Sequence, residues 1–211
     1  MGYSFNPDTH THYVDGVPVP GVTSVIDAMG LISPFCKVPE AAERGRNGHT
    51  LCQLCYSGEI DDYNVPEVSR PWVCAILRFM RDFDIMPYEF DASKMAIEFP
   101  VWSKFGYAGI PDLLSADLTL WDNKFWGSIG KQSLGNAGIQ TAAYAQAIKE
   151  RHGITVKKRK VVIFNIDNSR PYEVRGLNDP SDLPVFMGAL NVYKRLSQYQ
   201  KMSTEDLTKG E

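Results

Sequence analysis

The sequence predicts a single mixed α/β domain in which helices flank a central β-sheet, and three observations support this fold class. The 211 residues suffice for one domain with a buried core. The composition, 44% hydrophobic and 22% charged, is that of a globular protein. Segments with helical periodicity alternate with segments of period two. We expect a domain over 1–200, made of a hairpin and short helix (1–35), a helical segment (36–86) and an α/β core (88–200), and a flexible tail (201–211).

The elements before the core are a hairpin and three helices. Asp15 and Gly16 form a dipeptide typical of two-residue hairpin turns, and they separate short strands at 12–14 and 17–19. A short helix then ends at Gly30, because glycine readily adopts the conformation that terminates a helix. Two longer helices are predicted at 40–56 and 67–83.

In the core the period changes to two. Met95, Ile97 and Phe99 alternate with other side chains, which indicates a strand at 95–102. The remaining elements follow in order: strands at 107–114 and 118–126, a Gly- and Ser-rich loop at 127–138, a helix at 137–152, strands at 160–166 and 172–175, and a helix at 181–199. This order predicts a mixed sheet with helices against it.

Two of these strands bring carboxylates together. In a strand, residues i and i+2 share a face, so Asp122 and Lys124 point the same way. If the turn at 115–117 makes the two strands antiparallel neighbours, Asp112 converges with Asp122. Because two close carboxylates repel each other, a divalent cation with oxygen ligands, such as Mg²⁺, would stabilise the pair. Such an ion can activate water and polarise a phosphoryl oxygen.

Four motifs in this order resemble one enzyme family. They are Arg44-Gly45-Arg46-Asn47-Gly48-His49, Pro111-Asp112, Asp122-Asn123-Lys124 and Gln140 with Tyr144. Together they resemble the PD-(D/E)xK nuclease superfamily, in its RecB-like and lambda-exonuclease-like branch of phage and prophage nucleases. The resemblance covers about residues 10 to 148 and implies a restriction-endonuclease-like core.

The resemblance implies a role for each matching residue. His49, Asp112 and Asp122 would be metal ligands, with the backbone carbonyl of Asn123 as a fourth ligand. Lys124 would be the catalytic lysine, acting with the two aspartates.

Further residues complete the expected site. Glu98 occupies a position where many members of the family place an acidic residue. The expected DNA-binding residues are Gln140, Tyr144, Arg44 and Lys131.

The implied activity is that of a Mg²⁺-dependent deoxyribonuclease, an exonuclease of phage type in recombination or DNA processing, with Mn²⁺ as a substitute ion. DNA is the expected partner, a recombination or annealing protein is a candidate partner, and the oligomeric state stays open. No apolar run approaches the roughly 18 residues of a membrane span, and no signal peptide is visible. We therefore expect a cytoplasmic location and no membrane association. Some members of the family hold an iron–sulfur cluster through one cysteine before the core and three after it. Here all four cysteines precede the core, so the resemblance implies no such cluster.

Other interpretations stay open at this stage. Asp112 could be a turn residue, Asp122 and Lys124 a surface pair, and His49 or Glu98 solvated side chains. Phe125 stands where the family usually has Thr or Ser. By alternation it points away from Lys124, but it could remove a hydroxyl contact with phosphate. A DNA-binding or regulatory protein with weak or no cleavage is therefore the alternative function, and RNA is not excluded as a substrate.

The charge pattern favours a nucleic-acid site more than the total charge does. The net charge is −3, which by itself argues against a nucleic-acid binder. Residues 84–122, however, hold seven acidic and two basic side chains, whereas residues 123–160 hold eight basic and one acidic. An acidic segment that binds metal and a basic segment that meets phosphate fit this division.

Overall fold

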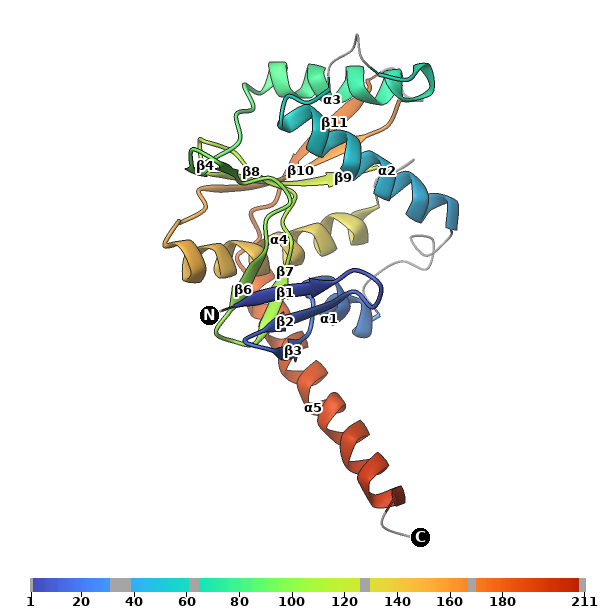
Figure 1. Ribbon diagram of the computed structural model, residues 1–211, viewed down its shortest axis with the longest axis vertical. Helices are drawn as coiled ribbons and strands as arrows, with labels where there is room; N and C mark the ends of the chain where they lie inside the picture. Colours follow the sequence, from blue (N-terminus) through green and yellow to red (C-terminus); the bar gives the residue numbers. More distant parts are fainter. Residues whose placement is uncertain (1, 31–38, 61–64, 126–129, 167–169, 209–211) are drawn as a thin grey trace.

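A computed structural model describes residues 2–30, 39–60, 65–125, 130–166 and 170–208 of the chain, the side chains up to residue 198 (Figure 1). Its helices are α1 (Val22–Ala28), α2 (Pro39–Tyr56), the 3-10 turn η2 (Glu67–Ser69), α3 (Arg70–Asp82), α4 (Lys131–His152) and α5 (Asp182–Thr208). Its strands are β1 (Tyr3–Asn6), β2 (Thr11–Val14), β3 (Val17–Val19), β4 (Glu89–Asp91), β5 (Lys94–Met95), β6 (Val101–Ser103), β7 (Tyr107–Gly109), β8 (Leu113–Leu114), β9 (Thr119–Lys124), β10 (Lys158–Phe164) and β11 (Tyr172–Gly176).

The central sheet has four strands in the order β11-β10-β9-β8. Strands β9 and β10 are parallel, while β8 with β9 and β10 with β11 are antiparallel. The parallel pair needs a crossover connection, which α4 provides. The sheet is therefore mixed, as the sequence predicted.

Helices cover both faces of this sheet: α2 and α3 lie on one side and α4 on the other (Figure 1). Because successive strand residues face opposite sides, each strand contributes side chains to two hydrophobic cores. Leu114 and Leu120 join the core that contains Ala143 of α4. Leu113 and Trp121 join the core formed with α2 and α3. This confirms the predicted fold class of a mixed sheet flanked by helices.

The N-terminal strands form a small antiparallel sheet in the order β1-β2-β3. Asp15 (φ 51°) and Gly16 (φ 78°) make the predicted two-residue turn between β2 and β3. The sequence prediction lacked β1, because four residues are too few for a clear periodicity. The short helix ends at the predicted Gly30, which adopts φ 68°.

The strand predicted at 95–102 is wrong as one continuous element. The chain forms β5 and β6 instead, and Glu98 between them adopts φ 44°. A left-handed residue cannot continue a strand, so the alternation of side chains is interrupted there. Ala96 and Phe99 are both buried as a result.

Two further boundaries differ for local reasons. The strand predicted at 107–114 is divided into β7 and β8, with Pro111, which has no N–H to donate, between them. Leu118 adopts φ 65° in the turn before β9, so the third strand begins at Thr119.

Both long C-terminal helices exceed their predicted lengths. Helix α4 begins at Lys131, six positions before the predicted start at Ala137, because its glycines do not prevent a helix that packs against the sheet. Helix α5 continues to Thr208, beyond the predicted end at 199, and its second half projects away from the domain (Figure 1). The flexible tail at 201–211 and the segment boundaries stay predictions. Within the described ranges, no helix combines the length and apolarity that crossing a membrane requires.

Candidate active site

The pairing of β8 with β9 determines where the two aspartates lie. Leu113 lies opposite Trp121, and Asp112 and Asp122 are the next pair along the same antiparallel register. The backbone N–H of Asn123 donates a hydrogen bond of 2.6 Å to Asp112 Oδ2. Both carboxylates are buried, Asp112 with 7% and Asp122 with 2% of its surface exposed. The predicted convergence of the two strands is therefore present in the structure.

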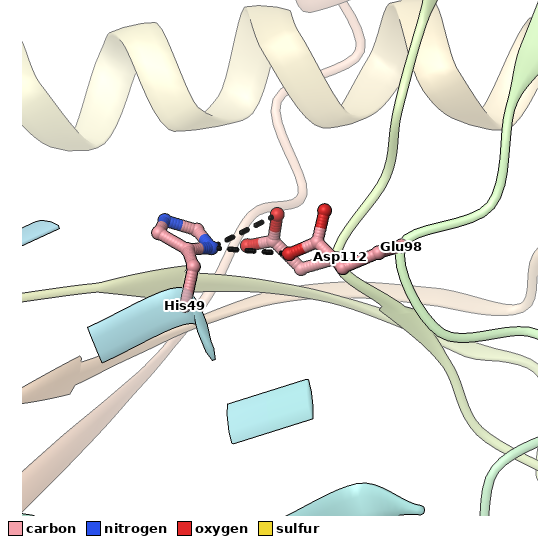
Figure 2. A group of neighbouring side chains, drawn as sticks. All are labelled: His49, Glu98 and Asp112. Carbon is pink, nitrogen blue, oxygen red and sulfur yellow. Dashed lines mark hydrogen bonds and ion pairs between the residues drawn. The ribbon is translucent and has the colours of Figure 1, made fainter. Parts of the chain in front are cut away.

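His49 and Glu98 join Asp112 in one cluster. Figure 2 shows both carboxylates directed at the imidazole, with His49 Nδ1 at 3.3 Å from Glu98 Oε1 and 3.5 Å from Asp112 Oδ1. One ligand atom from each of the three residues lies within 4.8 Å of the others. Helix α2 brings His49 here, since its neighbour Gly48 packs directly against the ring of Phe125.

Glu98 reaches the cluster through an unusual backbone conformation. Its φ of 44° lies in the left-handed region, which costs of order 1–3 kcal/mol for a residue other than glycine. Its N–H donates to the carbonyl of Asp112 at 2.9 Å, which fastens this segment beside β8. Strained residues of this kind concentrate at functional sites. Only the family resemblance indicated Glu98 as a site residue, and its left-handed backbone had no signal in the sequence.

A second group of polar side chains leads from β9 to α4. Lys124 Nζ lies 2.8 Å from Asp122 Oδ1 and 3.3 Å from Gln140 Oε1. The amide of Gln140 in turn donates to Tyr144 Oη at 3.2 Å. The shared face of Asp122 and Lys124, and the shared helix face of Gln140 and Tyr144, are as the spacing indicated.

Burial and mutual repulsion govern the charges of this site. Burial lowers the pKa of His49, but the carboxylates of Asp112 and Glu98 outweigh it and raise that pKa to about 9. Burial raises the pKa of Asp112. Burial also raises the pKa of Asp122 to about 6, although the ammonium of Lys124 opposes this shift. The charged forms of these two aspartates are therefore unfavourable when buried, and a bound cation would stabilise them.

The donor set fits a divalent metal ion. The cluster offers one imidazole nitrogen and two carboxylates, and Asp122 Oδ2 is buried without a hydrogen-bond partner in the described structure. The N–H and C=O of a strand residue point to the same neighbouring strand, so the carbonyl of Asn123 also faces Asp112. Hard cations such as Mg²⁺ prefer these oxygen ligands. The cluster differs from the expected ligand set in one respect: Glu98 lies with His49 and Asp112, whereas Asp122 pairs with Lys124.

The expected DNA-contacting residues lie in different environments. Gln140 is half-buried beside Lys124, and Lys131 is exposed at the start of α4. Arg44 is exposed and donates from Nε to the carbonyl of Phe125 at 3.0 Å. The ring of Tyr144 is buried against Gly109, so the site receives its hydroxyl and not its face.

The sequence did not identify the residues that support this site from the opposite face of the sheet. Tyr56 Oη donates to Asn123 Oδ1 at 3.0 Å. Phe125 is buried between Phe164 and Trp72, on the side of α2 and α3, as alternation predicted. Tyr56 follows His49 by seven residues and hence shares its side of α2, a helical spacing that could have identified it. Cys52 and Cys55 pack in this core, and Cys36 lies outside the described residues.

Comparisons with known proteins show a likeness to solved structures. No family model matches the chain, and no curated protein matches it. Among solved structures, the chain is similar to an alkaline exonuclease from Laribacter hongkongensis, with a TM-score of 0.46 and 11% sequence identity. The alignment covers 89% of this chain and 93% of that chain.

Proposed function

We propose that this protein is a metal-dependent nuclease that hydrolyses phosphodiester bonds of DNA. One observation carries the proposal: the cluster of His49, Glu98 and Asp112 lies beside the buried pair of Asp122 and Lys124, at adjoining ends of β8 and β9. Acidic ligands next to an ammonium group suit the hydrolysis of an anionic ester, because the metal and the ammonium both counter negative charge.

His49, Asp112, Asp122 and the carbonyl of Asn123 would hold the ion, with Glu98 beside them as a further carboxylate. A bound Mg²⁺, or Mn²⁺ in its place, would lower the pKa of a water molecule and polarise the phosphoryl oxygen. The N–H of Asn123 holds Asp112 in position through the 2.6 Å hydrogen bond to its carboxylate.

Lys124 places its ammonium where negative charge would develop on the phosphate. Its Nζ is held by Asp122 on one side and Gln140 on the other, so it occupies a defined position before substrate binds. Such preorganised charge contributes to catalysis because little reorganisation is needed during the reaction. Tyr144 supports Gln140 from the next helical turn.

Contacts to the rest of the DNA would come from exposed cations on α2 and at the start of α4. Arg44 and Lys131 are the candidates, and both are exposed. We further propose that the enzyme is an exonuclease in recombination or DNA processing, acting in the cytoplasm of the cell that contains it. The position of Phe125 on the far face indicates that its departure from the family pattern does not obstruct Lys124.

A nuclease assay tests the proposal. Linear and circular DNA are incubated with the protein in Mg²⁺, in Mn²⁺ and in excess EDTA. We expect degradation that requires the metal, and loss of linear but not circular DNA for an exonuclease. The variants Asp112→Ala and Lys124→Ala should each lower the rate by at least about 100-fold. Binding of Mg²⁺ or Mn²⁺ should also raise the melting temperature of the wild type, and not of Asp112→Ala.

Matched controls come from the exposed hairpin of β4 and β5. Asp91→Ala and Lys94→Ala change the same residue types away from the cluster and should keep the wild-type rate. Wild-type activity in Asp112→Ala or Lys124→Ala would show that the site is assigned wrongly. If neither metal supports degradation of either DNA, the alternative of a DNA-binding protein without cleavage is favoured.

A further inference from the structure

A groove that does not include the cluster of His49, Glu98 and Asp112 lies between the N-terminal sheet and α5. This groove has a volume of about 650 Å³. Its walls come from Thr9–Thr11 and Pro18–Gly21 on one side and from the middle of α5 on the other. Figure 1 shows these elements at the lower end of the domain, on the opposite side of α4 from α2 and α3.

The lining of the groove suits an anion. None of the described residues that line it is Asp or Glu. Its walls carry hydrogen-bond donors of four kinds: an ammonium, a hydroxyl, an imidazole and an amide, from Lys194, Ser24, His10 and Gln198. Lysine, serine and glutamine side chains are among those that proteins use to contact DNA phosphates.

Lys194 is held in the groove by the backbone of the turn before β7. Its Nζ donates to the carbonyl of Phe105 at 2.5 Å. It lies only 3.0 Å from where a Cβ would stand at Gly106, whose φ of 68° also favours glycine. Lys194 is half-buried, and the described residues give it no carboxylate partner. An anionic ligand would therefore add a charged partner that this ammonium lacks among the described residues.

The groove is within reach of a substrate held at the cluster. Gly106 lines the groove, and Asp112 follows it by six residues through β7. An extended chain spans about 3.3 Å per residue, so the two positions are at most about 20 Å apart. Successive base pairs of duplex DNA are about 3.4 Å apart along the axis, so this distance corresponds to about six base pairs.

We propose that this groove binds the sugar-phosphate backbone of DNA up to about six base pairs from the bond that is cleaved. The distance from the cleaved bond rests on the proposed function, whereas binding in the groove does not. Lys194 contacts a phosphate there, and the neighbouring hydroxyl and amide donors hold the same stretch of backbone.

The test measures DNA affinity without cleavage. Fluorescence anisotropy in EDTA compares a DNA hairpin with a stem of about 20 base pairs and one with about 5. For the long stem, Lys194→Glu should weaken binding about tenfold and reduce the salt slope of log K by about 1. For the short stem the loss should be smaller, because a stem shorter than the separation of cluster and groove cannot occupy both together.

Three variants make the result specific. Arg70→Glu makes the same change of charge at an exposed position on α3, across the sheet, and should leave affinity unchanged. Lys194→Arg should keep most of the affinity. Lys194→Gln keeps a donor for the Phe105 carbonyl, so it replaces Lys194→Glu if that variant has a lowered melting temperature.

The outcomes separate the groove from the proposed function. Equal affinities of Lys194→Gln and wild type for the long stem would overturn the groove, whereas equal losses for both stems would overturn its separation from the cluster. A wild type that binds the long stem through Lys194 yet degrades no DNA in either metal would overturn the nuclease and leave the groove standing.

Discussion

The two faces of β9 differ in the kind of side chain they bury. On the face toward α4, Asp122 and Lys124 are enclosed as a charged pair. On the face toward α2 and α3, Trp121 and Phe125 pack among aromatic rings. The polar face carries an orphaned carboxylate oxygen and is unfavourable for stability, whereas the apolar face stabilises the strand. The strand that carries the proposed site residues is therefore stabilised by aromatic packing on its opposite face.

The strongest test of this division changes Asp122 to Asn. The substitution removes a buried carboxylate of nearly the same shape, so cleavage should fall by at least about 100-fold. The free energy of unfolding should stay the same or rise, because one buried charge is lost. Nuclease assays and urea denaturation measure the two quantities. Asp91→Asn, in an exposed hairpin, is the control, and an Asp122→Asn variant that is active but unstable would contradict the comparison.

The opposite result is expected from Phe125→Ala. Phe125 is 4% exposed and stacks on Phe164, so its truncation should lower the free energy of unfolding by about 3–5 kcal/mol. The cleavage rate per folded molecule should change much less than in Asp122→Asn. Guanidinium denaturation provides the measurement, with Phe105→Ala as a control at a ring that is 40% exposed. A cost below about 1 kcal/mol would show that the apolar face does not hold the strand.

Two glycines of α2 sharpen the comparison because only one touches the apolar face. A Cβ at Gly48 would lie 2.5 Å from three atoms of the Phe125 ring, so Gly48→Ala should cost about 1–3 kcal/mol. Gly45, in the same helix, has open space, and Gly45→Ala should stabilise the protein by about 0.5–1 kcal/mol through helix propensity. Thermal unfolding of both variants measures the difference. If Gly48→Ala stabilises the protein as much as Gly45→Ala does, the ring of Phe125 moves away from the added Cβ without cost.

The local parts of the site could be predicted from the sequence. Asp122 and Lys124 share a face because strands have period two, and a short turn suffices to bring Asp112 opposite Asp122. Gln140 lies one helical turn from Tyr144, as their spacing predicted. The periodicity of hydrophobic residues likewise indicated most strands of the central sheet and the helices that flank it.

The remaining parts depend on contacts between distant segments. Glu98 reaches His49 through a left-handed backbone that no periodicity encodes. Of the two glycines in the motif around His49, an added Cβ at Gly45 would meet no atom within 4 Å, whereas one at Gly48 would meet the ring of Phe125. The early start of α4 at Lys131 arises in the same way, since packing outweighs the glycines of its first turns.

The smallest expected effect concerns Tyr56, which hydrogen-bonds to Asn123 on the face of β9 toward α2 and α3. Tyr56→Phe removes the hydrogen bond to Asn123 Oδ1 and leaves that buried oxygen without its donor, at a cost of about 1–2 kcal/mol. Because the N–H of Asn123 also holds Asp112, the cleavage rate should fall by a factor of about 2–5, equivalent to less than 1 kcal/mol. Tyr88→Phe is the control, since the described structure gives that hydroxyl no partner. A loss of stability with an unchanged rate would show that the apolar face supports the strand without positioning its carboxylates.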